Sequence, residues 1–466
     1  MNRQRRRFLR AAAAGGLAYA FGRTPGTVHA QMSGGGGFSD YKAMVCLFLF
    51  GGNDSWNMVV PTSAAEYDAY SNARGGPLGV GSGLAVPQAS LLPLTLQTPD
   101  PNGATYGMHP SMGGVQELFN AGRAAVVANV GPLIRPTTKS QYQTAATTGH
   151  ALPPQLFSHN DQQDQWHSLR GRAIVRSGWA GRVADVLNSQ LGAQQLPLNV
   201  SLSGQTFFQA GEVATPYVMG AAGANAFAGF GTGGTPLARR TAFEAIANAN
   251  YGTVYERGYA SVQRRAVQYA DRVNGAITAA RDFTALPNAG VTLSPLATQL
   301  RTVAKLIDVR SRLSMSRQIF FVSTGGFDTH DDLAADQPGL LGNVSASIKS
   351  FYDALTEIGM EGSVTLFTQS DFGRTLTSNG DGSDHAWGGV QLVVGGAVRG
   401  QNLYGRYPLL TINGPDDVGG GRMIPSVSSD QYAGTIARWF GINDANLPLV
   451  APSIGNFAQQ DLGFLI

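Results

Sequence analysis

Residues 43–50 are Ala43-Met44-Val45-Cys46-Leu47-Phe48-Leu49-Phe50, a continuous apolar run that stops abruptly at Gly51-Gly52-Asn53-Asp54-Ser55. A strand that is apolar at every position is typical of a parallel sheet buried on both faces. Similar strands are expected over 124–130, 319–322, 363–368 and 390–394, with helices over 110–121, 177–191, 340–358 and 430–440. This alternation predicts an α/β fold, a doubly wound and mostly parallel sheet flanked by helices.

The middle of the chain follows a different pattern. Residues 241–282 have helical periodicity in two pieces, and residues 296–313 have it again. We therefore expect residues 205–315 to form a mainly helical insertion. It would separate the two parts of the α/β core, 40–204 and 316–466, which follow a flexible leader over 31–39.

The size and composition of the chain exclude several classes of protein. A length of 466 residues fits one large α/β domain with insertions, or two domains. With 43% apolar and 14% charged residues, the chain cannot be disordered throughout. Its one cysteine, Cys46, excludes an intramolecular disulfide and is expected to pack in the core.

Residues 1–30 have the features of an export signal. The basic stretch 5–10 contains an arginine pair before Phe8-Leu9, and it is followed by a short apolar run over 11–21 and by a small-residue cleavage site at 28–30. The apolar run is too short to span a bilayer, and no later segment has the pattern of a transmembrane helix. We expect the twin-arginine translocation machinery to deliver a periplasmic or secreted protein that begins near Gln31. A basic disordered tail is the alternative.

The charge of the chain follows from that signal. Of 33 basic residues, six arginines lie in residues 1–30, which contain no acid, so that 27 basic and 30 acidic residues remain. The basicity therefore reflects targeting, and no nucleic acid partner is expected.

Polar clusters follow three of the expected strands. They are Asn53-Asp54-Ser55, Phe327-Asp328-Thr329-His330, and Ser370-Asp371-Phe372-Gly373-Arg374. Ligands of open parallel sheets bind beyond the carboxyl ends of the strands, so the three aspartates are expected to converge. In an extended segment, Asp328 and His330 lie on the same side. Asp384-His385 adds another carboxylate–imidazole pair. Such donors favour a divalent metal ion, whether zinc, calcium, magnesium or manganese.

Each cluster also has a structural interpretation. An aspartate after a strand often caps a helix or forms a turn, and a single histidine is often structural. It is the combination of clusters that favours a metal site. The sequence contains no HExxH, CxxC or EF-hand pattern, and its glycine-rich stretches lack the lysine of a P-loop.

Taken in order, five motifs resemble the exported bacterial proteins of domain-of-unknown-function family 1501. They are the segments 47–57, 156–163, 326–330, 370–375 and 384–389, within a resemblance that extends from about residue 40 to 450. That family is similar to the alkaline phosphatase and sulfatase superfamily. The resemblance implies an alkaline phosphatase-like α/β core and a metal-dependent hydrolase site, without a substrate.

The superfamily pattern also implies a set of metal ligands. Carried over residue by residue, it places them at Asp54, Asp328, His330, Asp371 and His385; Asp384 neighbours the last of these. Two departures argue against a full two-metal site. Phe372 stands where phosphatases and sulfatases have a histidine, and Asp328 and His330 are closer in sequence than the corresponding pair. One metal, with or without a second weaker one, fits these departures.

The nucleophile of that superfamily begins a helix after the second strand, where this chain has Thr137 and Thr138. A metal-ionised hydroxyl there would attack phosphorus or sulfur, although a helix cap explains these threonines equally well. Arg135, Lys139 or Arg374 would then balance an anionic substrate. His159 would act in proton transfer or line the cleft with Asp161, unless Ser158 and Asn160 simply hold a turn.

Three functions follow from this reading. The first is a metal-dependent hydrolase of phosphate or sulfate esters, with an anionic small molecule or polymer ester as substrate. The second is a catalytically silent exported scaffold or binding protein that keeps its metal for folding. The third, an oxidoreductase, has no glycine fingerprint, haem motif or cysteine cluster to support it.

Overall fold

The apolar run at 43–50 forms the central strand of a nine-stranded sheet. The computed structural model describes residues 38–171, 176–191, 194–225, 227 and 229–466, so the expected signal lies outside the described residues, as does the leader except for residues 38 and 39. Strand β1 (Lys42–Leu49) pairs in parallel with β8 (Arg317–Thr324) on one side and with β9 (Val364–Ser370) on the other. Every residue of β1 except Lys42 is buried, as the unbroken apolar pattern predicts.

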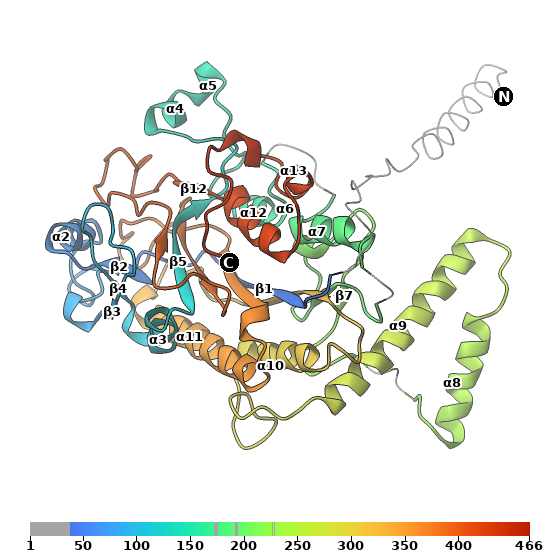
Figure 1. The fold of residues 1–466 in the computed structure, drawn as a ribbon. Helices are drawn as coiled ribbons and strands as arrows, with labels where there is room; N and C mark the ends of the chain where they lie inside the picture. The colour runs from blue at the N-terminus through green and yellow to red at the C-terminus, as the bar shows by residue number, and fades with distance from the viewer. Residues whose placement is uncertain (1–37, 172–175, 192–193, 226, 228) are drawn as a thin grey trace, which may run out of the picture. The chain divides into compact units, whose positions relative to one another are not determined.

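The other strands extend the sheet on both sides (Figure 1). Its order is β11-β5-β10-β9-β1-β8-β6-β7, and β12 also pairs with β5. Their bounds are β5 (Ala124–Gly131), β6 (Asn199–Ser201), β7 (Tyr217–Val218), β10 (Gly389–Val394), β11 (Leu403–Tyr404) and β12 (Val427–Ser428). All pairings are parallel except those of β10, which is antiparallel to both β9 and β5. The expected mostly parallel sheet is confirmed.

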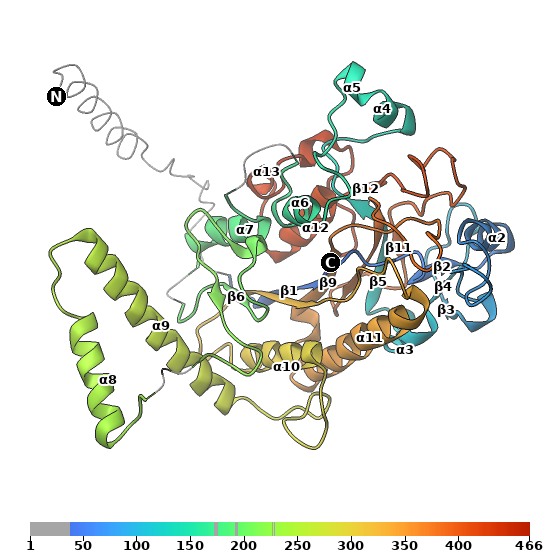
Figure 2. The same cartoon turned by 180° about the vertical axis from the view of Figure 1, so that it is seen from behind.

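Helices cover both faces of the sheet (Figures 1 and 2). Alternate residues of β1 point to opposite faces, into two separate apolar clusters. One face is covered by α3 (Gly113–Asn120), α10 (Pro295–Asp308) and α11 (Leu333–Glu357), and the other by α6 (His159–Ser168), α7 (Trp179–Asn188) and α12 (Ser429–Phe440). This is the doubly wound arrangement that the sequence predicts.

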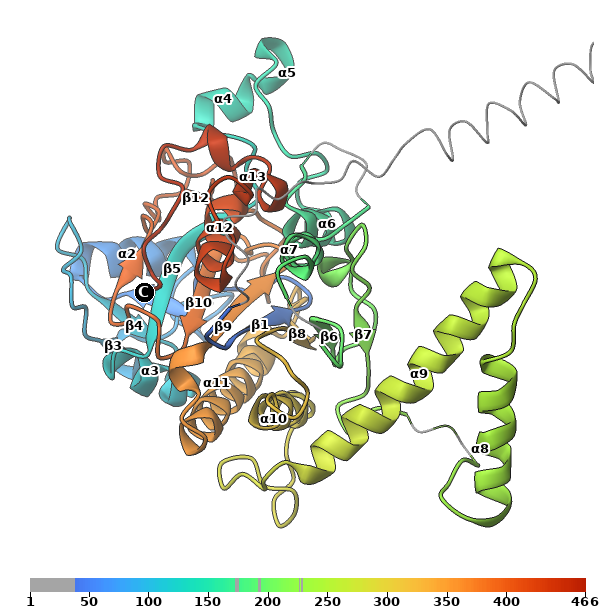
Figure 3. The same ribbon diagram turned by 45° about the vertical axis from the view of Figure 1, so that its right-hand side comes forward.

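The remaining elements are peripheral. A small antiparallel sheet contains β2 (Val59–Pro61), β4 (Tyr106–Met108) and β3 (Leu92–Leu94). The shorter helices are α2 (Ala64–Ala73), α4 (Lys139–Gln143), α5 (Ala145–Thr148) and α13 (Leu447–Val450). Helices α8 (Gly234–Ala247) and α9 (Val254–Ala279) lie beside each other, and α9 packs against α10 (Figure 3).

The long helices α8, α9 and α10 fall within residues 205–315, where β7, the one strand among the described residues of this range, lies at the edge of the sheet. The boundaries of the helical insertion stay a prediction, because residues 38–466 form one unit by their internal contacts. Within the described part of the chain, no helix is long and apolar enough to cross a membrane.

Candidate metal centre

Three imidazoles gather around one carboxylate oxygen at the edge of the sheet where β1, β8 and β9 end. The Nε2 atoms of His159, His330 and His385 lie 3.4, 3.3 and 3.6 Å from Asp328 Oδ1. In a tetrahedral site with metal–ligand bonds of about 2.0–2.1 Å, neighbouring ligand atoms are about 3.3–3.4 Å apart. The three separations fit that geometry. Ligand atoms of His159, Asp328 and His385 all lie within 4.8 Å of one another.

The second nitrogen of each imidazole has an acceptor. His159 Nδ1 lies 2.6 Å from Asp371 Oδ2, and His330 Nδ1 lies 3.1 Å from Asp384 Oδ1. His385 Nδ1 lies 2.8 Å from the carbonyl oxygen of Phe157. An acceptor at Nδ1 keeps the proton there and leaves the Nε2 lone pair free, as in metal sites whose histidines are oriented by carboxylates or carbonyls.

Two further observations support a cation at this point. His330 Nε2 and His385 Nε2 are 2.8 Å apart, a hydrogen-bond distance at which a proton or another cation lies between the two lone pairs. This pair is closer than the ligands of a tetrahedral site, and the group whose ligand atoms fit one ion is His159, Asp328 and His385. His159 Nε2 is buried and has no hydrogen-bond partner among the described residues. Imidazole nitrogens with one carboxylate form a donor set suited to a borderline ion such as zinc. The residues present therefore fit a divalent metal.

Arg374 holds the loops of the centre together. Its side chain is fully buried and donates to the carbonyl oxygens of Gly51, Gly52, Phe327 and Ser383, and also to Asp328 Oδ1. The loop after β1, the loop after β8 and the loop before β10 are thus linked through one guanidinium. Arg374 was expected to contact an anion, but in the structure its donors point inward to these loops.

Glycines allow these loops to approach closely. Gly51 has φ +113°, and a Cβ on it would lie 2.3 Å from the amide nitrogen of Asp328. A Cβ on Gly382 would lie 2.3 Å from the carbonyl oxygens of Thr329 and His330. Both contacts are closer than any side chain permits, so each glycine lets the backbone of one loop rest on the backbone of another.

Strand direction explains how His385 reaches the centre. Because β10 is antiparallel to β9, its first residue, Gly389, lies at the edge where β9 ends. The segment just before β10 therefore crosses the ends of β8 and β9. Aromatic packing fixes the rings: Phe372 lies against both His159 and His385, with centroid distances of 4.7 and 4.5 Å.

The surroundings shift the pKa values of three of these groups. Burial raises the pKa of Asp328, but the hydrogen bond and charge of Arg374 outweigh it, and the pKa lies below its usual range. The pKa of Asp384 is lowered in the same manner, against burial, by hydrogen bonds from Asn379 and His330. Burial lowers the pKa of His385. All three shifts favour the unprotonated forms that bind metals.

Asp54 lies in a different environment. Its Oδ2 accepts from Arg74 Nη2 at 2.7 Å and from Ser383 Oγ at 2.7 Å, and the side chains of Asp54 and Arg74 are both fully buried. Asp54 is not part of the group formed by His159, Asp328 and His385, although its Oδ1 is buried without a hydrogen-bond partner among the described residues. Asp371 and Asp384 likewise lie on the Nδ1 side of the histidines rather than among the Nε2 atoms.

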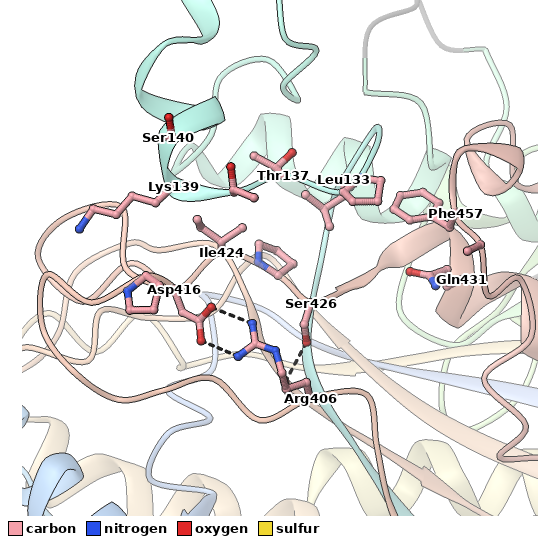
Figure 4. A pocket seen from close by; sticks show the side chains of 15 residues that line it. Leu133, Thr137, Lys139, Ser140, Arg406, Asp416, Ile424, Ser426, Gln431 and Phe457 are labelled. Carbon is pink, nitrogen blue, oxygen red and sulfur yellow. Dashed lines mark hydrogen bonds and ion pairs between the residues drawn. The ribbon is translucent and has the colours of Figure 1, made fainter. Parts of the chain in front are cut away.

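Thr137 and Thr138 are also apart from the imidazoles. They line a cavity of about 540 Å³ with Lys139, Arg406 and Asp416, and no residue of the metal centre lines it (Figure 4). Thr138 caps α4, Thr137 Oγ1 donates to the carbonyl of Arg135, and Lys139 donates to the carbonyls of Asn413 and Gly414. Arg135 is exposed and does not line the cavity.

Gln163 and Arg422 lie around the centre but were not identified from the sequence, unlike Asp161, which was expected to line the cleft. Gln163, one turn after His159 on α6, donates to Asp371 Oδ2 at 2.8 Å. Arg422 donates to the carbonyl of His385 at 3.2 Å, and its guanidinium lies 5.3 Å from the ring centre of Phe157. Asp161 accepts from Ser158 Oγ at 2.6 Å at the start of α6. Only the Asp371–Gln163 contact had a possible signal, since a four-residue step on a helix places Gln163 on the face of His159.

Comparison with known proteins places the chain in a family. Residues 41–447 match the family described as Protein of unknown function (DUF1501). The chain belongs to the DUF1501 family. The motifs of the metal centre, from the end of β1 to His385, all lie within the matched region. No curated protein matches the sequence of this DUF1501 protein.

Two solved structures have weak similarity to the fold of this chain. One is described as the crystal structure of Ps i-CgsB, with 9% identity and a TM-score of 0.34 over 89% of this chain and 77% of that one. Another is the PsFucS1 sulfatase from Pseudoalteromonas sp., with 12% identity and a TM-score of 0.30 over 96% of this chain and 73% of that one. At these values the likeness bears neither on the site residues nor on their chemistry.

Proposed function

We propose that this DUF1501 protein is a metal-dependent hydrolase of phosphate or sulfate esters. The observation that carries the proposal is the orientation of three imidazoles: each Nδ1 has an acceptor, and each Nε2 faces Asp328 Oδ1. His159, His330, His385 and Asp328 would hold the ion. A divalent ion at this point would supply Lewis-acid activation of the ester and of an attacking oxygen.

The exposure of the ligands favours a catalytic over a purely structural ion. The side chains of Asp328 and His330 are 52% and 37% exposed. Structural zinc sites are closed by four protein ligands, whereas catalytic sites keep a position open to water or substrate. A scaffold with a structural metal is the second candidate, favoured by the way the ion would join α6, the loop after β8 and the segment before β10.

Arg422 is the arginine we assign to the substrate anion. Arg374 is fully buried and directs Nε, Nη1 and Nη2 to backbone carbonyls and Asp328, so it is not placed to meet a ligand. Arg422 donates through Nε and Nη1 to the carbonyls of His385 and Gly419, and no hydrogen bond of its Nη2 is recorded among the described residues. A guanidinium with a free edge suits an ester oxyanion.

The attacking group is water or a nearby hydroxyl, because Thr137 and Thr138 lie in the separate cavity. The hydroxyl next to the centre along the chain is Ser158, whose Oγ donates to the Asp161 carboxylate. A carboxylate beside a hydroxyl is the arrangement of a nucleophile with its base. Comparison of Ser158→Ala with Thr137→Ala separates these possibilities, because only a serine nucleophile makes the first variant inactive while its metal is retained.

Metal analysis and an ester panel test the proposal. The purified protein should retain close to one divalent ion per chain and hydrolyse at least one phosphate or sulfate ester, and a chelator should abolish that activity until metal is restored. His385→Ala should lose the ion, whereas Thr137→Ala, the matched control, should keep it. A protein that binds the ion at this site but hydrolyses no ester would support the scaffold instead. A wild type without affinity for zinc, manganese, magnesium or calcium would contradict both.

A further inference from the structure

The hairpin of α8 and α9 carries an unusual concentration of exposed apolar side chains. Thirteen large hydrophobic residues are exposed in the described chain, and six of them lie on this hairpin. They are Leu237, Ile246, Val254, Tyr255, Tyr259 and Val262. Single exposed apolar residues are ordinary, but a group on one element marks an interaction surface.

The most exposed of these residues lie where the two helices meet. Ile246 is in the last turn of α8, Val254 and Tyr255 are in the first turn of α9, and Tyr259 follows one turn later. Tyr255 and Tyr259 are 87% and 69% exposed. We call these four residues the hairpin tip. Figure 3 shows α8 and α9 beside each other and away from the strands of the sheet, so this end is not covered by the core.

The charge of the hairpin is opposite to that of the remaining chain. Residues 234–279 contain six arginines and three acidic residues, whereas the other residues of 31–466 contain 21 basic and 27 acidic residues. The net charges are +3 and −6. Arg257, in the first turn of α9, is exposed, donates to the carbonyls of Tyr251 and Gly252, and has no ion pair with a described residue. The basic hairpin therefore attracts an anionic partner and repels a second hairpin of its own kind.

We propose that the hairpin tip docks on an anionic lipid surface. Tyrosine suits the boundary between headgroups and acyl chains, and Ile246 and Val254 beside it would enter the apolar layer. Exposed arginines of the two helices would meet the lipid phosphates, each strengthening binding about fivefold. The tip has apolar residues on both helices around their junction, a convex arrangement that fits a lipid surface better than a groove-binding peptide.

Vesicle flotation tests the proposal with the purified protein. Vesicles of phosphatidylcholine with about one third phosphatidylglycerol should carry the protein, vesicles of phosphatidylcholine alone should carry much less, and added salt should reduce binding. The double variant Tyr255→Ser/Tyr259→Ser should bind roughly tenfold less or weaker still, since burial of these rings is lost. Arg257→Gln should reduce binding about fivefold.

Matched controls lie elsewhere on the surface. Val291→Ser and Leu409→Ser replace exposed apolar residues outside the hairpin, and Arg312→Gln removes an exposed arginine. All three should bind vesicles like the wild type. Equal losses in the controls and the tip variants would overturn the assignment of the surface.

A fluorescence measurement gives a second readout. The five tryptophans of the chain are all buried. Tyr255→Trp therefore adds one exposed indole, whose emission should shift to shorter wavelength when the anionic vesicles are added. An unchanged emission together with no flotation would overturn the proposal. A concentration-dependent dimer that disappears in the double tyrosine variant, without vesicle binding, would assign the tip to a second copy of the chain instead.

Discussion

The metal centre and the cavity around Thr137 lie at ends of strands in one sheet, yet their side chains are held in different ways. In the centre, partners come from distant parts of the chain: His159 meets Asp371, and Arg374 joins the loops after β1 and β8. In the cavity, Thr138 bonds within its own helix and Thr137 bonds to Arg135 and His150, whereas Lys139 reaches a distant part of the chain, the carbonyls of Asn413 and Gly414. Long-range, buried partners mark a site that the fold has organised; local partners mark the ends of helices and turns.

The largest difference in stability should appear between variants of two arginine–aspartate pairs. Arg74–Asp54 is fully buried, so Arg74→Leu leaves an unpaired buried carboxylate and should lower the free energy of unfolding by about 3–5 kcal/mol. Arg406–Asp416 lines the cavity, and Arg406 is 53% exposed. Because the Asp416 side chain is only 11% exposed and accepts two hydrogen bonds from Arg406, Arg406→Leu should cost about 1–2 kcal/mol. Urea unfolding of both variants measures the difference, and equal losses would refute the contrast.

The next effect concerns metal affinity. Asp371 Oδ2 lies 2.6 Å from His159 Nδ1, whereas Asp328 faces Nε2 of the same ring. Asp371→Asn should therefore weaken metal binding by about 10–100-fold, as expected for a partner that orients a ligand. Asp416→Asn is the matched control in the cavity and should leave the affinity unchanged. Competition with a chromophoric chelator measures both; an unaltered affinity in Asp371→Asn would remove Asp371 from the centre.

The third effect is a pH dependence of stability that arises from His167, a buried imidazole outside the metal centre. His167 lies on α6 like His159, but its Nε2 is buried with no hydrogen-bond partner among the described residues, and burial lowers its pKa to about 3. In the unfolded chain the pKa of His167 is near 6.5, so as the pH falls the unfolded chain takes up this proton before the folded protein does. Stability from the neutral ring is complete above pH 6.5 and is lost as the pH falls toward 3.

His167→Phe removes that proton uptake. The ring packs against Phe48 and Phe321, so phenylalanine fits the same aromatic surroundings. We expect the variant to resemble the wild type at pH 7 and to lose less stability than the wild type between pH 6 and pH 4. Urea unfolding at several pH values tests this, and parallel pH profiles of the two proteins would refute it.

The sequence predicted the sheet better than the contacts of the site. Unbroken apolar runs identify β1, β5, β8, β9 and β10, because burial on both faces requires them, but nothing in the pattern of 390–394 shows that β10 runs antiparallel. Asp328, His330, His385 and His159 were found from strand ends and motifs. Arg74 and Arg422 were not, because an arginine's partner depends on tertiary packing over hundreds of residues.

The assignment of Asp54 to the metal illustrates the same limit. An aspartate at the end of the central strand is placed correctly by the sheet, yet the side to which its carboxylate turns is set by Arg74, 20 residues later, and by Ser383, 329 residues later. Residue order gives the edge of the sheet on which a group lies. Residue order does not identify the residue with which that group pairs.

The smallest effect is expected in the cavity. Thr138 accepts from Gln141 N, and Gln141 accepts in return from the amide of Thr138, which completes a capping box on the five-residue helix α4. Thr138→Ala removes this cap at a local cost of about 1 kcal/mol. Because α4 is short and has no buried residue, hydrogen exchange should detect fraying there while the global unfolding midpoint hardly changes. Metal affinity and ester turnover should equal those of the wild type, since no residue of the metal centre touches this cap. A loss of turnover with metal retained would instead restore Thr138 as the nucleophile, and would require α4 to move from its cavity to the imidazoles during the reaction.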